Sequence, residues 1–337
     1  MKNLRRPLVA VSMIAAVAML ATATAASAAI PSDMQSLDSS PVSVYATSYV
    51  STGATATING DVVAGLYLTA GADSTINGDT SAGGATTLGA EATALKICSE
   101  GATTLGALAA GNSIYSGGAT TLGALATANA VESVGAYTAS VSADVGDDTA
   151  TVVCVPPPAD AAAIFTTLLD NARGAVGGMP ATDPLTLATP GPLAGSISGD
   201  VTYAPGVYDV SGMLTVAAGV TITLDADFVS DAEFIFDISS YLAVGAGVNV
   251  EVVNAPGNPR VIWNVGGYAT VGAGANISGT VMTGSYVTMG VDSAVTGSRI
   301  PNGSGGFSCL DGGAVYSLAA YVSLGAGATV GSTGGTC

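Results

Sequence analysis

The sequence contains no histidine and few basic residues. Seven Lys and Arg stand against 24 Asp and Glu, and charged residues make up only 9% of the 337-residue chain. The absence of histidine removes the commonest general base, and so few Lys and Arg cannot form the clusters that bind a nucleic-acid backbone. We therefore expect a non-enzymatic protein with no cofactor and no nucleic-acid partner.

Cysteine is also scarce. No CxxC pair is present, and without histidine the common zinc-binding spacings are excluded, so no metal site is expected. Four cysteines in an exported chain instead predict two disulfides, for which three connectivities are possible. We favour pairing Cys98 with Cys154 and Cys309 with Cys337, because each bond would link a local region.

Long apolar runs are confined to the start of the chain. Residues 1–28 combine three basic residues, an apolar run over residues 8–20 and small residues up to Ala28, which predicts a signal peptide. The Arg5-Arg6 pair leaves twin-arginine export open, but an ordinary signal is favoured. No later stretch reaches about 18 uninterrupted apolar residues. We expect a secreted or cell-surface protein without a membrane span, most simply a monomer.

Removing residues 1–28 leaves four basic against 24 acidic residues, a net charge of −20. Residues 29–44 are rich in Ser and Pro and predict a flexible lead-in. The organised part of the chain is expected to begin at residue 45.

What the chain does contain is a short repeat. The segment GATTLGA occurs at Gly84, Gly101 and Gly118, with periods of 17 residues. Equivalent positions extend this pattern at spacings of 17 or 18: Tyr49, Tyr67, Ala85, Ala102, Ala119 and Tyr137. Such a period predicts an all-β fold, a β-solenoid whose coils lie about 4.8 Å apart. The expected inward column is Leu88, Leu105 and Leu122.

The repeat is interrupted after about residue 150. Three prolines are followed by apolar residues at helical spacing: Ile164, Phe165, Leu168, Leu169, Ala172 and Val176. This pattern predicts one helix lying against the solenoid. The expected organisation is one domain over residues 45–337, with N-terminal coils at 45–155, the helix at 156–178 and C-terminal coils at 195–337.

In the second set of coils the aromatic position recurs at wider intervals. From Met213 through Tyr241, Tyr268 and Tyr286 to Tyr321 the spacings are 28, 27, 18 and 35 residues. Either each wide interval is one coil with an excursion, or it contains two coils of which one has a degenerate repeat.

Four segments together resemble the family of secreted microbial ice-binding (antifreeze) proteins: PGVYDVSGMLTV, ITLDADFVSDAEFIFDI, VIWNVGGYATVGAGANISGTVM and YVTMGVDSAVTGSRI, within residues 195–300. The resemblance implies a discontinuous right-handed β-helix of triangular section, with one long α-helix alongside. It also implies ice as the partner, with inhibition of ice growth and recrystallisation. The chain departs from the family in its additional N-terminal coils and its longer segment after Arg299.

An outward column of threonines is the candidate ice-binding site. Stiff β-branched side chains on regularly spaced strands give a flat array of hydroxyl and methyl groups. The candidate residues are Thr69, Thr87, Thr104, Thr121, Thr270 and Thr288, with Ser323 continuing the line. The alternative is that Thr is simply a good exposed strand residue.

A second outward column, of tyrosines, lies two residues before the threonines. These rings could pack under the helix, mark a neighbouring face or bind sugar rings, although aromatic packing between strands is favoured. The alternative function is accordingly a non-enzymatic surface or adhesion protein with a surface polysaccharide as partner. An enzyme would need clustered carboxylates, and the densest acidic run, at residues 225–237, is interpreted as an exposed excursion.

Overall fold

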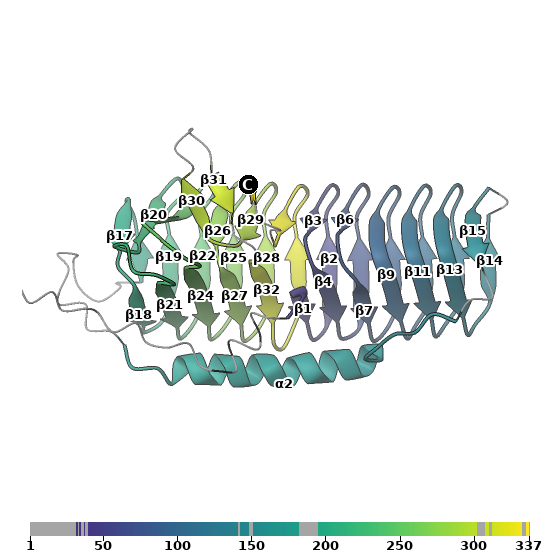
Figure 1. Ribbon diagram of the computed structural model, residues 1–337, viewed down its shortest axis with the longest axis horizontal. Coiled ribbons are helices and arrows are strands. Elements are labelled where there is room, and N and C mark those ends of the chain that lie inside the picture. The colour runs from purple at the N-terminus through teal and green to yellow at the C-terminus, as the bar shows by residue number, and fades with distance from the viewer. Residues whose placement is uncertain are drawn as a thin grey trace, which may run out of the picture.

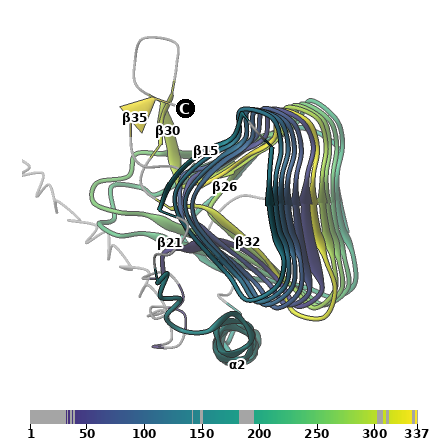
Figure 2. The ribbon, with the colours of Figure 1, turned by 90° about the vertical axis from the view of Figure 1, so that its right-hand side faces the viewer.

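The computed structural model describes residues 32, 34, 37, 40–140, 142–147, 151–181, 195–301, 307–309, 312–331 and 335–336. These residues form a β-solenoid with three sides, seen end-on in Figure 2, and one long helix beside it. The expected β-helix fold with a single accompanying helix is confirmed.

One side of the solenoid is a 12-stranded parallel sheet, called here the flat face. Its strands are three or four residues long in most coils, and their middle residue points outward between two inward residues. In spatial order they are β14 (Tyr137–Ala139), β12 (Thr120–Leu122), β10 (Thr103–Leu105), β8 (Thr86–Leu88), β5 (Tyr67–Ala70), β2 (Tyr49–Thr52), β33 (Val322–Leu324), β28 (Val287–Met289), β25 (Ala269–Val271), β22 (Leu242–Val244), β19 (Leu214–Val216) and β16 (Ser196–Ile197).

A 20-stranded parallel sheet folds around the other two sides. The second face contains β15 (Asp144–Asp147), β6 (Thr75–Ile76), β3 (Thr57–Ile58), β34 (Thr329–Val330), β29 (Ala294–Thr296), β26 (Asn276–Ser278), β23 (Asn249–Val253), β20 (Thr221–Asp225) and β17 (Val201–Tyr203). The helix-side face contains β7 (Thr80–Ala82), β4 (Asp61–Ala64), β1 (Val42–Ala46), β32 (Ala314–Ser317), β27 (Thr280–Thr283), β24 (Arg260–Val265), β21 (Glu233–Ile238) and β18 (Gly206–Val210). Three longer strands belong to both: β9 (Thr93–Ser99), β11 (Ala110–Ser116) and β13 (Thr127–Ser133).

The first described coil lies in the middle of the solenoid. From β2 the coils proceed through β5 and β8 to β14 at one end, and the helix α2 (Pro158–Gly177) then runs back along the molecule (Figure 1). The chain re-enters at β16, at the opposite end, and its coils return until β33 pairs with β2. The last coil therefore lies against the first, and the two halves form one continuous stack.

Strand register corrects one detail of the predicted repeat. Thr120 pairs with Tyr137, so the residue equivalent to Ala119 is Ala136, not Tyr137, and the last period is 17 residues. The wide intervals in the second half are each a single coil with an excursion, because Leu214 pairs directly with Leu242.

The interior is filled by columns of inward side chains. Leu88, Leu105 and Leu122 are buried and lie one above the other, as predicted. The later coils enclose larger groups: Phe236 stacks on Trp263 with ring centroids 4.3 Å apart, and the Trp263 indole N–H donates to the carbonyl of Ser278 at 3.0 Å. Apolar burial in these columns is the main source of stability.

The helix α2 covers the helix-side face. Its first turn contains Pro158 and Asp160, which suit a helix N-terminus, and it ends before Gly178. Phe165, Leu169, Ala172 and Val176 are buried, whereas Ile164 is 60% exposed and does not belong to the packed stripe predicted for it. Phe165 contacts the rings of Tyr45 and Tyr316, so tyrosines of the first and last coils lie under the helix.

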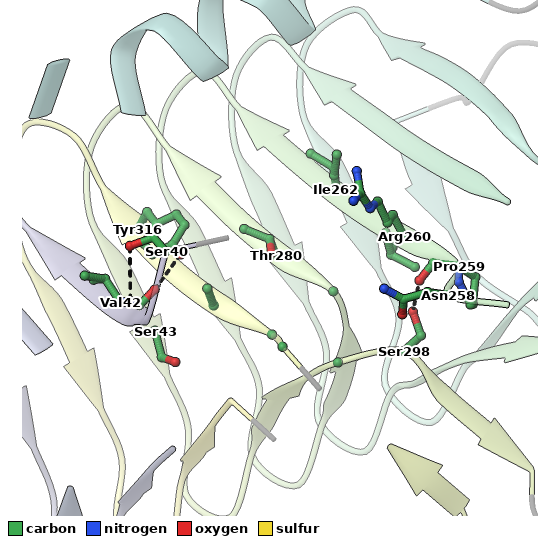
Figure 3. A pocket seen from close by; sticks show the side chains of 16 residues that line it. Ser40, Val42, Ser43, Asn258, Pro259, Arg260, Ile262, Thr280, Ser298 and Tyr316 are labelled. Atoms are coloured by element: carbon green, nitrogen blue, oxygen red, sulfur yellow. Dashed lines mark hydrogen bonds between the residues drawn. The ribbon is translucent and has the colours of Figure 1, made fainter. Parts of the chain in front are cut away.

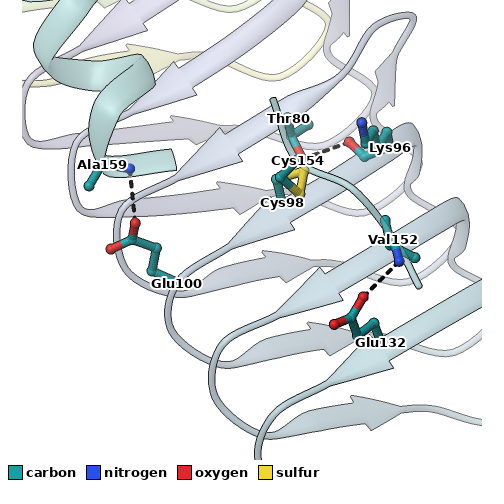
Figure 4. Close-up of a disulfide and its surroundings, with 8 residues drawn as sticks. All are labelled: Thr80, Lys96, Cys98, Glu100, Glu132, Val152, Cys154 and Ala159. Carbon is teal, nitrogen blue, oxygen red and sulfur yellow. Dashed lines mark hydrogen bonds between the residues drawn. A yellow bond between two sulfur atoms is a disulfide. The ribbon is translucent and has the colours of Figure 1, made fainter. Parts of the chain in front are cut away.

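The segment before the helix is fastened to the solenoid (Figure 4). Cys98 on β9 forms the predicted disulfide with Cys154. The carboxylate of Glu132 accepts the backbone N–H of Val152 at 2.7 Å, and Glu100 accepts that of Ala159, in the first turn of α2, at 3.0 Å. A carboxylate at this end of a helix is electrostatically favourable. Cys337 and the side chain of Cys309 lie outside the described residues.

The other end of the helix is held by a polar network. The Arg173 guanidinium donates to the Asn264 side-chain oxygen at 3.2 Å and to the Val265 carbonyl at 2.8 Å, while the Asn264 amide donates to Asp237 at 2.7 Å. Asp237 therefore does not belong to the exposed excursion predicted for the acidic run; it lies beneath α2. Burial lowers the pKa of Arg173, partly offset by Asp170 and Asp237.

Several coils in the second half of the stack contain additional segments that project from the solenoid. A small antiparallel sheet of β30 (Arg299–Pro301), β31 (Phe307–Cys309) and β35 (Gly335–Thr336) projects beside the second face (Figure 2). No helix in the described part of the chain has the length and apolar character needed to cross a bilayer. Nor do the described residues bring three potential metal ligands together.

Candidate functional face

Within the described residues, no helix or sheet covers the flat face along its length. The helix α2 packs on the helix-side face, and the small antiparallel sheet stands beside the second face, whereas nothing lies over the flat face in Figure 2. A sheet face of this length without a covering layer is a natural place for binding.

A single column of short side chains runs along the whole flat face. Each member lies on a strand of this face and pairs in register with the next. In spatial order the column is Thr138, Thr121, Thr104, Thr87, Thr69, Ser51, Ser323, Thr288, Thr270, Ala243, Thr215 and Ser196. Ala243 alone lacks a hydroxyl.

All six threonines named from the sequence belong to this column. The structure joins their two groups through Ser51 and Ser323, whose hydroxyls lie 3.4 Å apart across the junction of the two halves. Sequence reasoning missed Thr138, because the register was placed one residue late there, and it missed Thr215 beside Met213. The correct period of 17 residues would have identified Thr138.

The residues flanking this column divide the flat face into two segments. In the alanine segment, the strands β8, β10 and β12 place Ala85, Ala102 and Ala119 beside the threonines. In the tyrosine segment, the strands β22, β25, β28, β33 and β2 have a tyrosine at the same position: Tyr241, Tyr268, Tyr286, Tyr321 and Tyr49. Between the two segments lies β5, whose exposed Tyr67 is in register with Tyr49. Thr87, Thr104 and Thr121 are exposed, whereas Thr270 and Thr288 are partly covered.

The five tyrosines form a continuous stack. Ring centroids are separated by 4.9, 4.8, 5.1 and 4.8 Å along Tyr241, Tyr268, Tyr286, Tyr321 and Tyr49, with interplanar angles of 7° or less. Stacking between strands, the favoured interpretation of the tyrosine column, is thus confirmed. The alternative that these rings pack under the helix is wrong, because they lie on the flat face.

Glycines form the third outward column of the flat face. A Cβ atom at Gly106 would lie 2.8 Å from backbone atoms of the neighbouring coil, and one at Gly272 would lie 2.5 Å from them. Only glycine permits the coils to approach this closely. The alanine segment therefore presents Ala, Thr and Gly side by side, with no large side chain in the three columns.

Two competing sites are weaker. The second face has its own outward threonines. Thr329, Thr57, Thr75 and Thr93 follow one another in consecutive coils, but Ala110 separates them from Thr127, and Asp144 ends the line. They form a shorter line than the column of the flat face.

A cavity of about 240 Å³ lies among the described residues between the second and helix-side faces (Figure 3). Two of its hydroxyls already serve the protein: Ser298 donates to the Pro259 carbonyl at 2.7 Å and Tyr316 donates to the Val42 carbonyl at 2.6 Å. Unlike the flat face, this cavity has no repeated array of side chains.

A family described as ice-binding-like matches residues 100–303, more than half of the sequence. No match was found among curated proteins.

Several solved structures are similar. One is an ice-binding protein from the Antarctic ascomycete Antarctomyces psychrotrophicus, at 15% identity and a TM-score of 0.45, covering 86% of this chain and 94% of that one. Another is a domain of an ice-binding protein from Shewanella frigidimarina, at 18% identity and a TM-score of 0.47, covering 86% and 93%. A third is a glycosylated ice-binding protein from an Arctic yeast, at 15% identity and a TM-score of 0.46, covering 86% and 90%.

Proposed function

We propose that this chain, which belongs to the ice-binding-like family, adsorbs to ice through the alanine segment of its flat face and so inhibits ice growth and recrystallisation. The observation that carries the assignment to this segment is the unobstructed array of Ala, Thr and Gly columns. No catalytic step is required, and neither a cofactor nor a metal ion takes part.

The physical basis is preorganisation. Thr side chains have few χ1 rotamers, and hydrogen-bonded coils hold them about 4.8 Å apart. Hydroxyl and methyl groups at fixed spacing can hold a layer of water in a regular arrangement. Because the surface is already ordered, adsorption loses little conformational entropy, and many weak contacts along the column add up.

The tyrosine segment is a poorer ice surface. Its rings rise beside Thr270 and Thr288 and partly cover them, whereas Thr104 and Thr121 stand next to Ala102 and Ala119. A flat crystal plane can therefore approach Thr104 and Thr121, whereas the tyrosine rings keep it away from Thr270 and Thr288. Of the six threonines named from the sequence, we therefore assign Thr87, Thr104 and Thr121 to the centre of the site, Thr69 to its border, and Thr270 and Thr288 to its periphery.

Export is part of this proposal. The sequence of residues 1–28 supports a signal peptide, and the Cys98–Cys154 disulfide supports an oxidising compartment outside the cytoplasm. The protein would act there as a monomer.

The test is thermal hysteresis and ice recrystallisation inhibition by residues 29–337. Thr104→Tyr combined with Thr121→Tyr should abolish most of the activity without changing the thermal unfolding midpoint by more than a few degrees. Thr57→Tyr combined with Thr75→Tyr, the same change on the second face, is the matched control and should leave activity intact. An inactive parent protein would refute ice binding, and an active Thr104/Thr121 variant would refute this face.

A further inference from the structure

The tyrosine segment has properties that ice adsorption does not use. Its five stacked rings bury their faces against one another, so their edges and phenol hydroxyls form a ridge parallel to the solenoid axis. Among the described residues, no hydrogen-bond partner is found for the hydroxyls of Tyr268, Tyr286, Tyr321 or Tyr49. The ridge thus offers a row of unused donors and acceptors.

A second row of hydroxyls lies at the foot of the ridge. Thr270, Thr288, Ser323 and Ser51 follow the tyrosines coil by coil. Beyond them the glycine column forms the lowest part of the surface, and Gly290 and Gly325 cannot be enlarged, because a Cβ at either would lie 2.6 Å from the neighbouring coil. The result is a stepped surface, with a wall of phenols and a floor of small hydroxyl side chains.

The electrostatics of this surface favour a neutral ligand. None of the tyrosine, hydroxyl or glycine positions of the segment is charged, although the mature chain has a net charge of −20. Burial, and the neighbouring rings of Tyr268 and Tyr321, raise the pKa of Tyr286 above its usual value of 10, so the phenol stays protonated at neutral pH. An anionic polymer would be repelled by the rest of the molecule.

We propose that the tyrosine ridge and the adjoining hydroxyl column bind an uncharged, extended polysaccharide whose chain lies parallel to the solenoid axis. The phenols repeat every 4.8 to 5.1 Å, and the sugars of an extended β-linked glucan repeat at a similar distance. Successive sugars therefore meet equivalent pairs of phenol and Thr or Ser hydroxyls. Each hydrogen bond contributes little in water, but bonds repeated along a rigid template add without further ordering.

Binding is measured by native electrophoresis in gels containing hydroxyethyl cellulose or mixed-linkage β-glucan. Carboxymethyl cellulose serves as the anionic counterpart, and bovine serum albumin as the reference for mobility. The parent protein should be retarded by the uncharged polymers and not by the anionic one. Absence of retardation in both uncharged polymers, or equal retardation in carboxymethyl cellulose, would overturn the proposal.

Variants test the ridge itself. Tyr268→Thr with Tyr286→Thr interrupts the stack and should raise the dissociation constant at least tenfold, while Tyr268→Phe with Tyr286→Phe keeps the stack, removes two hydroxyls and should have a smaller effect. If the double Thr variant does not fold, Tyr286→Thr and Tyr286→Phe give the same comparison. Retardation equal to that of the parent in the Thr variants would refute a role for the ridge.

Thr104→Tyr with Thr121→Tyr leaves the tyrosine segment untouched and should bind the polysaccharides as the parent does. Its ice activity is measured separately, so failure of polysaccharide binding and failure of ice binding are distinguished.

Discussion

The alanine and tyrosine segments share the solenoid backbone and the outward column of short side chains, yet the coil of Ala102 and the coil of Tyr268 differ at three positions. The flanking outward residue is Ala102 in one and Tyr268 in the other; the inward residue next to it is Thr103 or Ala269; and the left-handed corner residue is Leu108 or Gly274. Register and inward packing thus set the fold, while one outward residue per coil changes the surface from flat to ridged.

Exchanging the flanking residue should have the largest effect. Ala102→Tyr with Ala119→Tyr extends the ridge into the alanine segment and should remove most of the ice activity, because the rings keep a flat ice plane away from Thr104 and Thr121. Tyr268→Ala with Tyr286→Ala should enlarge the flat region and raise activity. Thermal hysteresis at matched concentrations measures both, and no change in either direction would show that the tyrosines do not obstruct ice.

Truncating a core side chain should lower the free energy of unfolding more in the coils of the tyrosine segment than in those of the alanine segment. Trp263→Ala removes a large buried ring that stacks on Phe236 and should cost about 4 kcal/mol of unfolding free energy, whereas Leu105→Ala should cost about 3 kcal/mol. Chemical denaturation followed by circular dichroism gives both values. Thr288→Ala, on the surface, should change stability by less than about 0.5 kcal/mol and serves as the control.

The inward threonines of the alanine segment should lower the free energy of unfolding by a smaller amount. The hydroxyls of Thr86, Thr103 and Thr120 are buried and have no hydrogen-bond partner among the described residues, whereas Val287 occupies the equivalent site of the tyrosine segment. Thr103→Val should therefore stabilise the protein by about 1 kcal/mol. The reverse change, Val287→Thr, should destabilise it by a similar amount, and a loss of stability in Thr103→Val would point to an internal partner for the hydroxyl.

Substitutions of the corner residues should change the free energy of unfolding in opposite directions and by about 1 kcal/mol or less. Leu108 adopts φ 59° and Gly274 φ 64°, and side chains at such angles are strained. Leu108→Gly should stabilise by about 0.5 kcal/mol, because relief of strain exceeds the added freedom of the unfolded chain. A Cβ at Gly274 would meet open space, so Gly274→Ala should destabilise through backbone strain alone, by about 1 kcal/mol. If Leu108→Gly and Gly274→Ala shift the unfolding midpoint in the same direction, this explanation is wrong.

Acid should stabilise the protein modestly. Burial raises the pKa of Asp61 and of Asp237 above 3.8, against the opposing hydrogen bonds from Asp79 and Asn264. The folded state then binds protons more readily than the unfolded state, so stability rises as pH falls from neutral towards 3.8. Thermal unfolding between pH 7 and 4.5 measures the slope, and Asp61→Asn with Asp237→Asn should flatten it.

Much of the architecture could be predicted because the repeat is physically strict. A period of 17 or 18 residues with Leu88, Leu105 and Leu122 at one inward position permits few folds other than stacked coils, and the prolines and apolar stripe before residue 178 identify the helix. The errors are local. The repeat predicts Tyr137 as the equivalent of Ala119, one residue later than the observed Ala136, because the last copy of the repeat is degenerate. Ile164 lies at the exposed edge of the apolar stripe of the helix.

Other features depend on contacts that no sequence pattern reveals. Asp237 and Arg173 share Asn264 only because α2 lies over β21 and β24. The placement of the tyrosines on the open flat face, with Tyr45 and Tyr316 under the helix instead, was likewise decided by which side of the solenoid the helix covers.

By itself, the sequence determined the coil, its inward and outward residues and the six threonines of the column, because alternation along a strand follows from backbone geometry alone. Only the tertiary structure decided that the first described coil lies in the middle of the stack and that the last coil pairs with it. That pairing of β33 with β2 joins the separate threonine runs into one line and makes Tyr49 the final ring of a stack that begins at Tyr241. The physical reason is that parallel strands pair through backbone hydrogen bonds, which do not depend on how far apart the partners lie in the sequence.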